Sequence, residues 1–127
     1  MSLAKEFACV FLGGGLGSLT RYYLFLLINR SFLLSFPMGT LACNALASFI
    51  VGLLFAWGES KLFTNKQMWL LLSVGFCGGF STFSTFSNET LALVRSGQYF
   101  VAIINVLASM LLCLLACFLG FSIGKPQ

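Results

Sequence analysis

Charge is almost absent from this sequence. Only 8% of its 127 residues are charged, histidine and aspartate do not occur, and 59% of the residues are hydrophobic. The mean hydropathy of +1.00 lies far from the balance of a soluble domain. Because there is no histidine and no Cys-x-x-Cys pair, neither a zinc site nor a disulfide is expected. These absences predict an integral membrane protein with no soluble domain, and no enzymatic activity is expected.

Four long apolar runs separate the few charges, at roughly 7–28, 37–57, 68–94 and 99–123. Each has about 20 residues or more, enough for a helix to cross a hydrocarbon core of about 30 Å. The first run is not a secretory signal, because it is long, lacks a small-residue cleavage pattern and contains three consecutive glycines. We therefore predict an all-α membrane protein in which residues 1–127 form a single domain of four transmembrane helices.

The basic residues divide almost equally between the two sides of such a bundle. Four spans place both termini and the middle loop on one side, with Lys5, Lys61, Lys66 and Lys125, and leave Arg21, Arg30 and Arg95 on or toward the other. Orientation normally follows an excess of Lys and Arg in cytoplasmic loops, so a balanced chain should insert both ways. Four helices alone also leave little room for a polar path. We expect an antiparallel, dual-topology homodimer.

The scattered basic residues and the cysteines suggest no further partner. The net charge of +4 is not clustered, so no nucleic-acid partner is expected. The five cysteines all lie inside apolar runs, where they are interpreted as small apolar fillers: Cys9, Cys43, Cys77, Cys113 and Cys117. Gly13-x-x-x-Gly17 in the first span would allow close helix contact, although that spacing alone is a weak signal.

Polar residues recur at four-residue intervals inside two spans. The second span has Thr40, Asn44 and Ser48, and the fourth has Asn105, Ser109, Cys113 and Cys117. Residues four apart form a slowly winding stripe on one helix face. Each stripe alone is compatible with simple helix–helix contact, but together they supply enough donors to replace water around a small ion. Because no ionisable group lies at mid-membrane, passive permeation is favoured over proton-coupled exchange.

The third span contains the sequence GFCGGFSTFSTFSN at residues 75–88. The Gly78-Gly79 pair predicts a break in this helix, because each glycine lowers helix preference by about 1 kcal/mol. A break frees carbonyls that can bind a cation and N–H groups that favour an anion, although a kink that only improves packing is the alternative. The repeat after it sets Phe rings beside hydroxyls, and the positive edges of the rings could stabilise an anion without trapping it.

Three stretches resemble signatures of the fluoride channels often called Fluc or CrcB proteins. They are Gly13-Gly14-Gly15-Leu16-Gly17 followed by Arg21-Tyr22, then Gly39-Thr40 leading to Asn44, and last Gly75-x-x-Gly78-Gly79-Phe80-Ser81-Thr82-Phe83-Ser84-Thr85-Phe86 with Glu89. The similarity covers essentially the whole chain. It implies a dual-topology homodimer in the inner membrane of a bacterium, with two parallel pores that each pass fluoride out of the cell.

The resemblance also implies roles for individual residues. Phe83 and Phe86 would line the pore and Asn44 would donate a hydrogen bond to fluoride, and the further pore residues would be Thr40, Ser84, Thr85, Asn105 and Ser109, with Cys113 and Cys117 continuing the fourth-span track. The chain departs here from family members that carry Tyr at the position of Asn105 and hydroxyls further along the track. A structural Na⁺ that is not transported would be held by the backbone carbonyls of Gly78 and Ser81 from each copy. Arg21 would belong to a vestibule that attracts anions.

Two other classes of membrane protein share parts of this pattern. A small dual-topology drug exporter also has four spans and antiparallel dimers, but it requires a mid-membrane Glu in the first span, and positions 10–20 contain none. A non-selective accessory membrane subunit would have no use for the aromatic repeat, so replacing its rings should leave transport unchanged.

Overall fold

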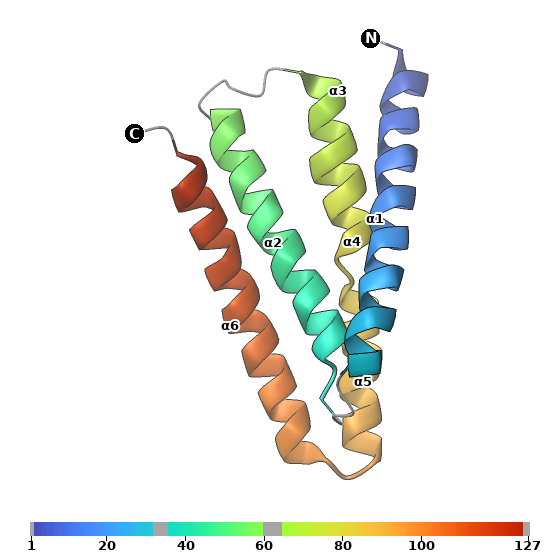
Figure 1. Cartoon of the computed structure of the whole chain (residues 1–127), viewed down its shortest axis with the longest axis vertical. Helices are drawn as coiled ribbons and strands as arrows, with labels where there is room; N and C mark the ends of the chain where they lie inside the picture. Colours follow the sequence, from blue (N-terminus) through green and yellow to red (C-terminus); the bar gives the residue numbers. More distant parts are fainter. Residues whose placement is uncertain (1, 32–35, 60–64, 126–127) are drawn as a thin grey trace.

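The computed structural model describes residues 2–31, 36–59 and 65–125, and within these ranges all regular structure is helical. The first, second and fourth spans are the single helices α1 (Leu3–Ser31), α2 (Met38–Glu59) and α6 (Tyr99–Gly124). The third span is assembled from four shorter pieces, α3 (Lys66–Trp69), η1 (Leu70–Cys77), α4 (Gly78–Phe80) and α5 (Phe83–Arg95). Figure 1 shows these as four columns, with the start of α1 and the end of α6 at the same end of the molecule.

All four columns are long and apolar enough to cross a membrane. The spanning segments are Leu3–Asn29, Met38–Gly58, Lys66–Arg95 and Tyr99–Gly124. This confirms the prediction of an all-helical protein with four spans, and the chain is a multi-pass membrane protein. The helices extend a few residues beyond most of the expected ranges, because helix hydrogen bonding continues past the apolar segment into the interface.

Glycines in α1 bring its backbone against the backbone of the third span. A Cβ atom placed on Gly13 would overlap the carbonyl oxygen of Leu71, and one on Gly17 would overlap that of Phe76. Gly79 of α4 meets the Gly14 carbonyl in the same way. Small residues permit this approach in membranes, where dispersion contacts and not the hydrophobic effect drive helix association. The Gly13-x-x-x-Gly17 spacing therefore serves contact within one chain.

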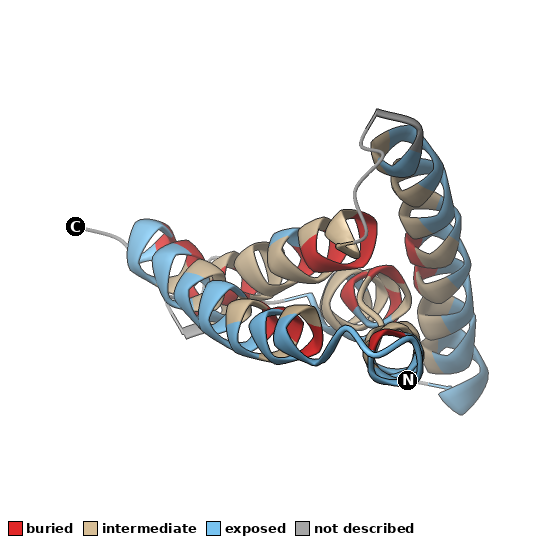
Figure 2. Cartoon of the chain, turned by 90° about the horizontal axis from the view of Figure 1, so that it is seen from below, coloured by how far each residue is buried: buried red, intermediate tan, exposed pale blue. Residues whose placement is uncertain are grey.

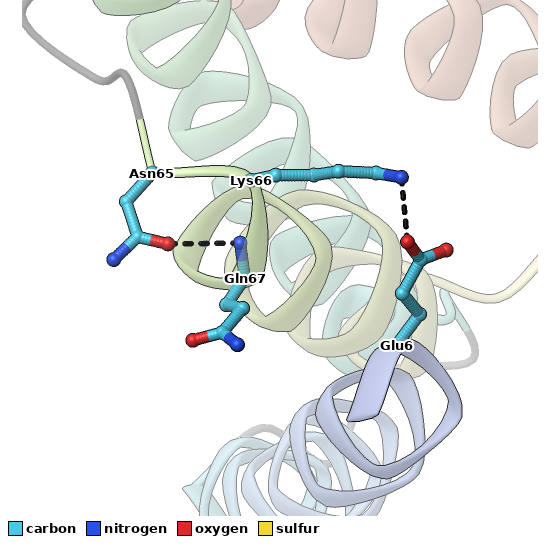
Figure 3. Close-up of polar contacts among 4 residues, drawn as sticks. All are labelled: Glu6, Asn65, Lys66 and Gln67. Carbon is cyan, nitrogen blue, oxygen red and sulfur yellow. Dashed lines mark hydrogen bonds and ion pairs between the residues drawn. The ribbon is translucent and has the colours of Figure 1, made fainter. Parts of the chain in front are cut away.

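The end of the bundle at which α1 and α3 begin is held by polar contacts (Figure 3). Asn65 caps α3, since its Oδ1 accepts a hydrogen bond from the backbone N–H of Gln67 at 2.9 Å. Lys66 Nζ lies 2.6 Å from Glu6 Oε1, which links α3 to α1. The lysine side chain is 63% exposed, so the pair contributes about 0–1 kcal/mol.

The third span differs from the prediction in where it breaks. Gly78 is helical, with φ −64° and ψ −38°, and α4 continues through Gly79 to Phe80. The extended residues are Ser81 (φ −83°, ψ 156°) and Thr82 (φ −152°, ψ 115°). The break is present near Gly78-Gly79, as expected, but the glycine pair itself is helical and the extended residues begin two positions after Gly79. The physical reason is that Gly79 is needed for contact with α1, not for unusual dihedral angles.

The chain buries little of its apolar surface. One buried cluster consists of Cys43, Ala47 and Phe80, with Ile50 and Phe76 among the side chains packed against it. Figure 2 shows buried residues along the faces where helices meet and exposed residues over the outward faces. Large apolar side chains on those outward faces are suited to lipid or to another polypeptide.

Candidate functional site

The break in the third span is held by the side chain of Asn44 on α2. Its Oδ1 accepts from the Thr82 N–H at 2.7 Å, and its Nδ2 donates to the Thr82 carbonyl at 3.1 Å. In an unbroken helix the Thr82 N–H would donate to the Gly78 carbonyl. Non-helical backbone at membrane depth is tolerated only where protein or a cavity satisfies it. One amide thus satisfies both backbone groups of Thr82, which is half-buried.

Helix α5 restarts because Thr82 is its N-cap. The Thr82 Oγ1 accepts from the Thr85 N–H at 3.2 Å and donates to the Thr85 hydroxyl at 3.0 Å. The Ser84 hydroxyl lies 3.2 Å from the same oxygen. Threonine in extended conformation is a preferred N-cap. This signal was present in the sequence, and it would have placed the break more accurately than the glycine pair.

The opposite side of the break is bound to α1. The Gly79 carbonyl accepts from Arg21 Nε at 3.1 Å and from Ser18 Oγ at 3.4 Å. In a continuous helix this carbonyl would accept from the N–H of Phe83 instead. Arg21 is therefore attached to the break through one nitrogen, and its cationic group lies at the junction of α1, α2 and α5.

Four of the predicted pore residues meet at one cavity of about 280 Å³ between α2, α5 and α6, here called the aromatic cavity. It is lined by Asn44, Ser48, Ser81, Thr82, Phe83, Phe86, Ser109, Met110 and Cys113. The two Phe rings lie 5.5 Å apart between centroids and are tilted by 45°. Among the described residues, its lining is uncharged and combines ring surfaces with amide and hydroxyl groups. Such a lining can donate hydrogen bonds to a small anion without binding it as an ion pair.

Three other predicted residues meet at a second cavity of about 210 Å³, here called the arginine cavity. It is lined by Arg21, Tyr22, Phe25, Thr40, Cys43, Thr82 and Thr85. Thr82 lines both cavities and so lies between them. The Thr40 hydroxyl donates to Glu89 Oε1 at 2.8 Å, and Glu89 Oε2 is buried without a hydrogen-bond partner in the part of the chain that the structure describes. An arginine near this cavity favours the approach of anions.

The two residues predicted to hold Na⁺ line a third cavity of about 230 Å³, here called the serine cavity. Its lining is Ala47, Ser48, Val51, Ser73, Cys77, Gly78 and Ser81. The carbonyls of Gly78 and Ser81 would accept from residues 82 and 85 in a continuous helix. Both of those N–H groups donate to side chains instead, to Asn44 and to Thr82. Within residues 2–31, 36–59 and 65–125 there is no group of three or more His, Cys, Asp or Glu side chains that could hold a metal.

Two predicted pore residues lie outside these cavities. Asn105 is 1% exposed and donates to the Thr90 hydroxyl at 2.9 Å, which links α6 to α5. Ser84 is exposed and bonds to the N-cap. The sequence interpretation also did not give Ser18 and Thr90 a role. Nothing in their own spacing marks them, because each depends on a partner in another helix.

The comparisons with known proteins identify the family of the chain. Residues 8–121 match the family described as CrcB-like protein, Camphor Resistance (CrcB). A protein of Pyrococcus furiosus is 45% identical over 126 residues, which cover 95% of this chain and 97% of that protein. One of Magnetococcus marinus is 44% identical over 120 residues, covering 94% and 98%, and one of Elusimicrobium minutum is 45% identical over 126, covering 98% of each. All three are named fluoride-specific ion channel FluC. The chain belongs to the CrcB-like protein family.

Proposed function

We propose that this chain forms a passive channel that is selective for fluoride and exports it from the cell, which lowers its toxicity. The observation that carries the proposal is the aromatic cavity, where Phe83 and Phe86 lie beside Asn44 and Ser109. Fluoride is small, strongly hydrated and a strong hydrogen-bond acceptor, so a dense set of neutral donors can replace its water. Larger halides gain less from such a lining. The names of the relatives support the same ion.

The proposed channel is an antiparallel homodimer of two oppositely inserted copies, with two pores. Phe83 is 79% exposed in the single chain, although its ring is expected to meet the ion. A second copy packed on this face would enclose the ring and complete the wall of the cavity. The near-equal division of basic residues between the two sides favours both insertions. Fusions of a reporter to the C-terminus should show both orientations, and a single orientation in every copy would reject this assembly.

A structural Na⁺ at the dimer axis belongs to the same proposal. The Gly78 and Ser81 carbonyls have lost their helical donors and line the serine cavity, so two copies would supply four carbonyl oxygens. A fixed cation would offset the cost of moving an anion through a low dielectric. Replacing all Na⁺ by a large organic cation should lower fluoride flux. Unchanged flux would reject the site.

The decisive experiment measures anion efflux from liposomes that contain the purified chain. Fluoride-loaded vesicles should empty rapidly after a potassium ionophore is added, whereas chloride-loaded vesicles should not. Equal rates for both anions, or no fluoride efflux, would reject the assignment. Phe83→Ile should slow efflux, and Phe11→Ile is its matched control, because Phe11 is 80% exposed on α1 and lies outside the three cavities.

The expected location is the inner membrane of a bacterial cell. The four spanning segments require a bilayer, and an exporter of a toxic anion acts at the membrane that encloses the cytoplasm. Fractionation of cells that express the chain should recover it with this membrane.

A further inference from the structure

Two sulfur-containing side chains line the aromatic cavity. Met110 and Cys113 both lie on α6 and are the only sulfur-containing residues in the described lining. They are three residues apart, so their Cβ atoms lie roughly 5–6 Å apart on one helix face. A thioether and a thiol therefore face the same space from adjacent turns, beside the rings of Phe83 and Phe86.

Sulfur donors of this kind bind soft cations. Thiolate and thioether ligands favour Cu(I) over hard ions such as Na⁺ and Mg²⁺. Monovalent d¹⁰ cations, Cu(I) and Ag⁺, accept two ligands in a nearly linear arrangement, so two sulfurs are a sufficient set. The described lining holds no carboxylate or imidazole that would compete with the two sulfurs for the metal.

We propose that Met110 and Cys113 form a binding site for a monovalent d¹⁰ metal cation in the wall of the aromatic cavity. When the cation binds, the Cys113 S–H bond breaks, its proton leaves to water and a sulfur–metal bond forms. The Met110 sulfur donates a lone pair to the same metal and loses nothing. No electron is transferred, and the site changes by one bound metal and one released proton.

Three of the other cysteines line cavities that lack this arrangement. Cys43 lines the arginine cavity, Cys77 lines the serine cavity, and Cys117 lines an apolar cavity between α2 and α6 of about 400 Å³. In the described linings of those three cavities there is no methionine and no second cysteine. The chain thus provides internal controls, since each of these thiols is inside the bundle but has no soft partner in its cavity.

A metal in this position would block conduction. The aromatic cavity of one chain measures about 280 Å³, and the metal would occupy the space between the Phe rings and α6. Because one proton leaves when the metal binds, the net charge of the site stays at zero, so the block comes from the space that the metal occupies. This consequence rests on the proposed function, whereas metal binding does not.

The test uses Ag⁺ with the full-length protein in chloride-free nitrate buffer, and it has two readouts. The first is protection of Cys113 from alkylation by iodoacetamide, located by peptide mass spectrometry in the natural chain. Ag⁺ should protect Cys113 at lower concentrations than it protects Cys77 and Cys117. The second is fluoride efflux, in which each variant is compared with its own metal-free rate. Silver fluoride is soluble, so the two ions can be present together.

Single substitutions distinguish the contributions of Cys113 and Met110 to metal binding. Cys113→Ser should raise the Ag⁺ concentration for half-inhibition at least about 100-fold, beyond the 10–100-fold typical for loss of a second-shell partner. Met110→Leu, which keeps the size of the side chain, should raise it about 10-fold. Cys77→Ser and Cys117→Ser should leave it unchanged.

Three results would overturn the site. They are equal protection of all the thiols, full sensitivity in Cys113→Ser, and full sensitivity in Met110→Leu. A chain that shows no fluoride efflux before Ag⁺ is added would instead reject the proposed function, and the alkylation readout would still decide the metal site.

Discussion

Replacing Asn44 by Leu tests whether one amide holds the broken helix. The change keeps the shape of the side chain but removes both hydrogen bonds to the backbone of Thr82, of 2.7 and 3.1 Å. An unsatisfied buried polar group costs about 1–3 kcal/mol, so two should lower the free energy of unfolding by about 2–6 kcal/mol. Asn44→Asp retains an acceptor for the Thr82 N–H but loses the donor, so it should lose about half as much.

The matched control is Ser48→Ala, one turn further along α2. Ser48 lines the same cavity, but its hydroxyl donates at 2.8 Å to the Asn44 carbonyl within its own helix. Its loss removes polarity from the cavity and leaves the break intact, so the free energy of unfolding should change by less than about 0.5 kcal/mol. Unfolding is measured by titration with SDS in mixed micelles, followed by tryptophan fluorescence, and fluoride efflux is recorded for each variant. A loss below about 1 kcal/mol in Asn44→Leu would show that the amide does not support the break.

The remaining predictions concern helix contact, the ion pair and the pore. Gly79→Ala should lower the free energy of unfolding by about 1–3 kcal/mol because its methyl group overlaps α1. Gly78→Ala should raise the free energy of unfolding by about 0.5–1 kcal/mol, because apart from its chain neighbours and its own helix backbone no described atom lies within 4 Å of the new carbon. Equal effects in SDS titration would contradict the packing argument. A double-mutant cycle of Glu6→Gln and Lys66→Gln should give a coupling below about 1 kcal/mol that falls with added salt; a larger value that is insensitive to salt would be inconsistent with an exposed pair. Phe83→Ile should slow fluoride efflux roughly tenfold, equivalent to about 1.4 kcal/mol on the barrier, and unchanged efflux would favour a packing role for the ring.

The hydropathy of the sequence was sufficient to predict the spanning helices of the fold, but not how they pack. Apolar runs separated by Lys66 or Arg95 are long enough to span, so the number and order of helices were predictable. The π-helical turns at Leu70–Cys77 were not predicted, because they depend on the fit of that segment against α1. Hydropathy reports which residues avoid water, and it does not report how two backbones meet.

The candidate site was predictable in its residues more than in its geometry. Asn44 and Phe83 line the same cavity, but the hydrogen bonds of Asn44 to Thr82 depend on a partner 38 positions away. Asn105 follows the four-residue stripe of α6, yet its amide turns to Thr90 and links two helices. Periodicity assigns a residue to a face of its own helix. It cannot tell whether that face meets a cavity or another side chain.

The contact of α1 with the third span has a mechanical consequence. At Gly13 and Gly17 main chain touches main chain, with no side-chain torsion between the two to absorb displacement. Sliding or rotating α1 against the third span would drive carbonyl oxygens into α-carbons. The two segments should therefore move together as one rigid body. Any adjustment during ion passage is then left to small torsional movements of the rings and hydroxyls, which makes this fold better suited to a permanently open sieve than to a gate that swings.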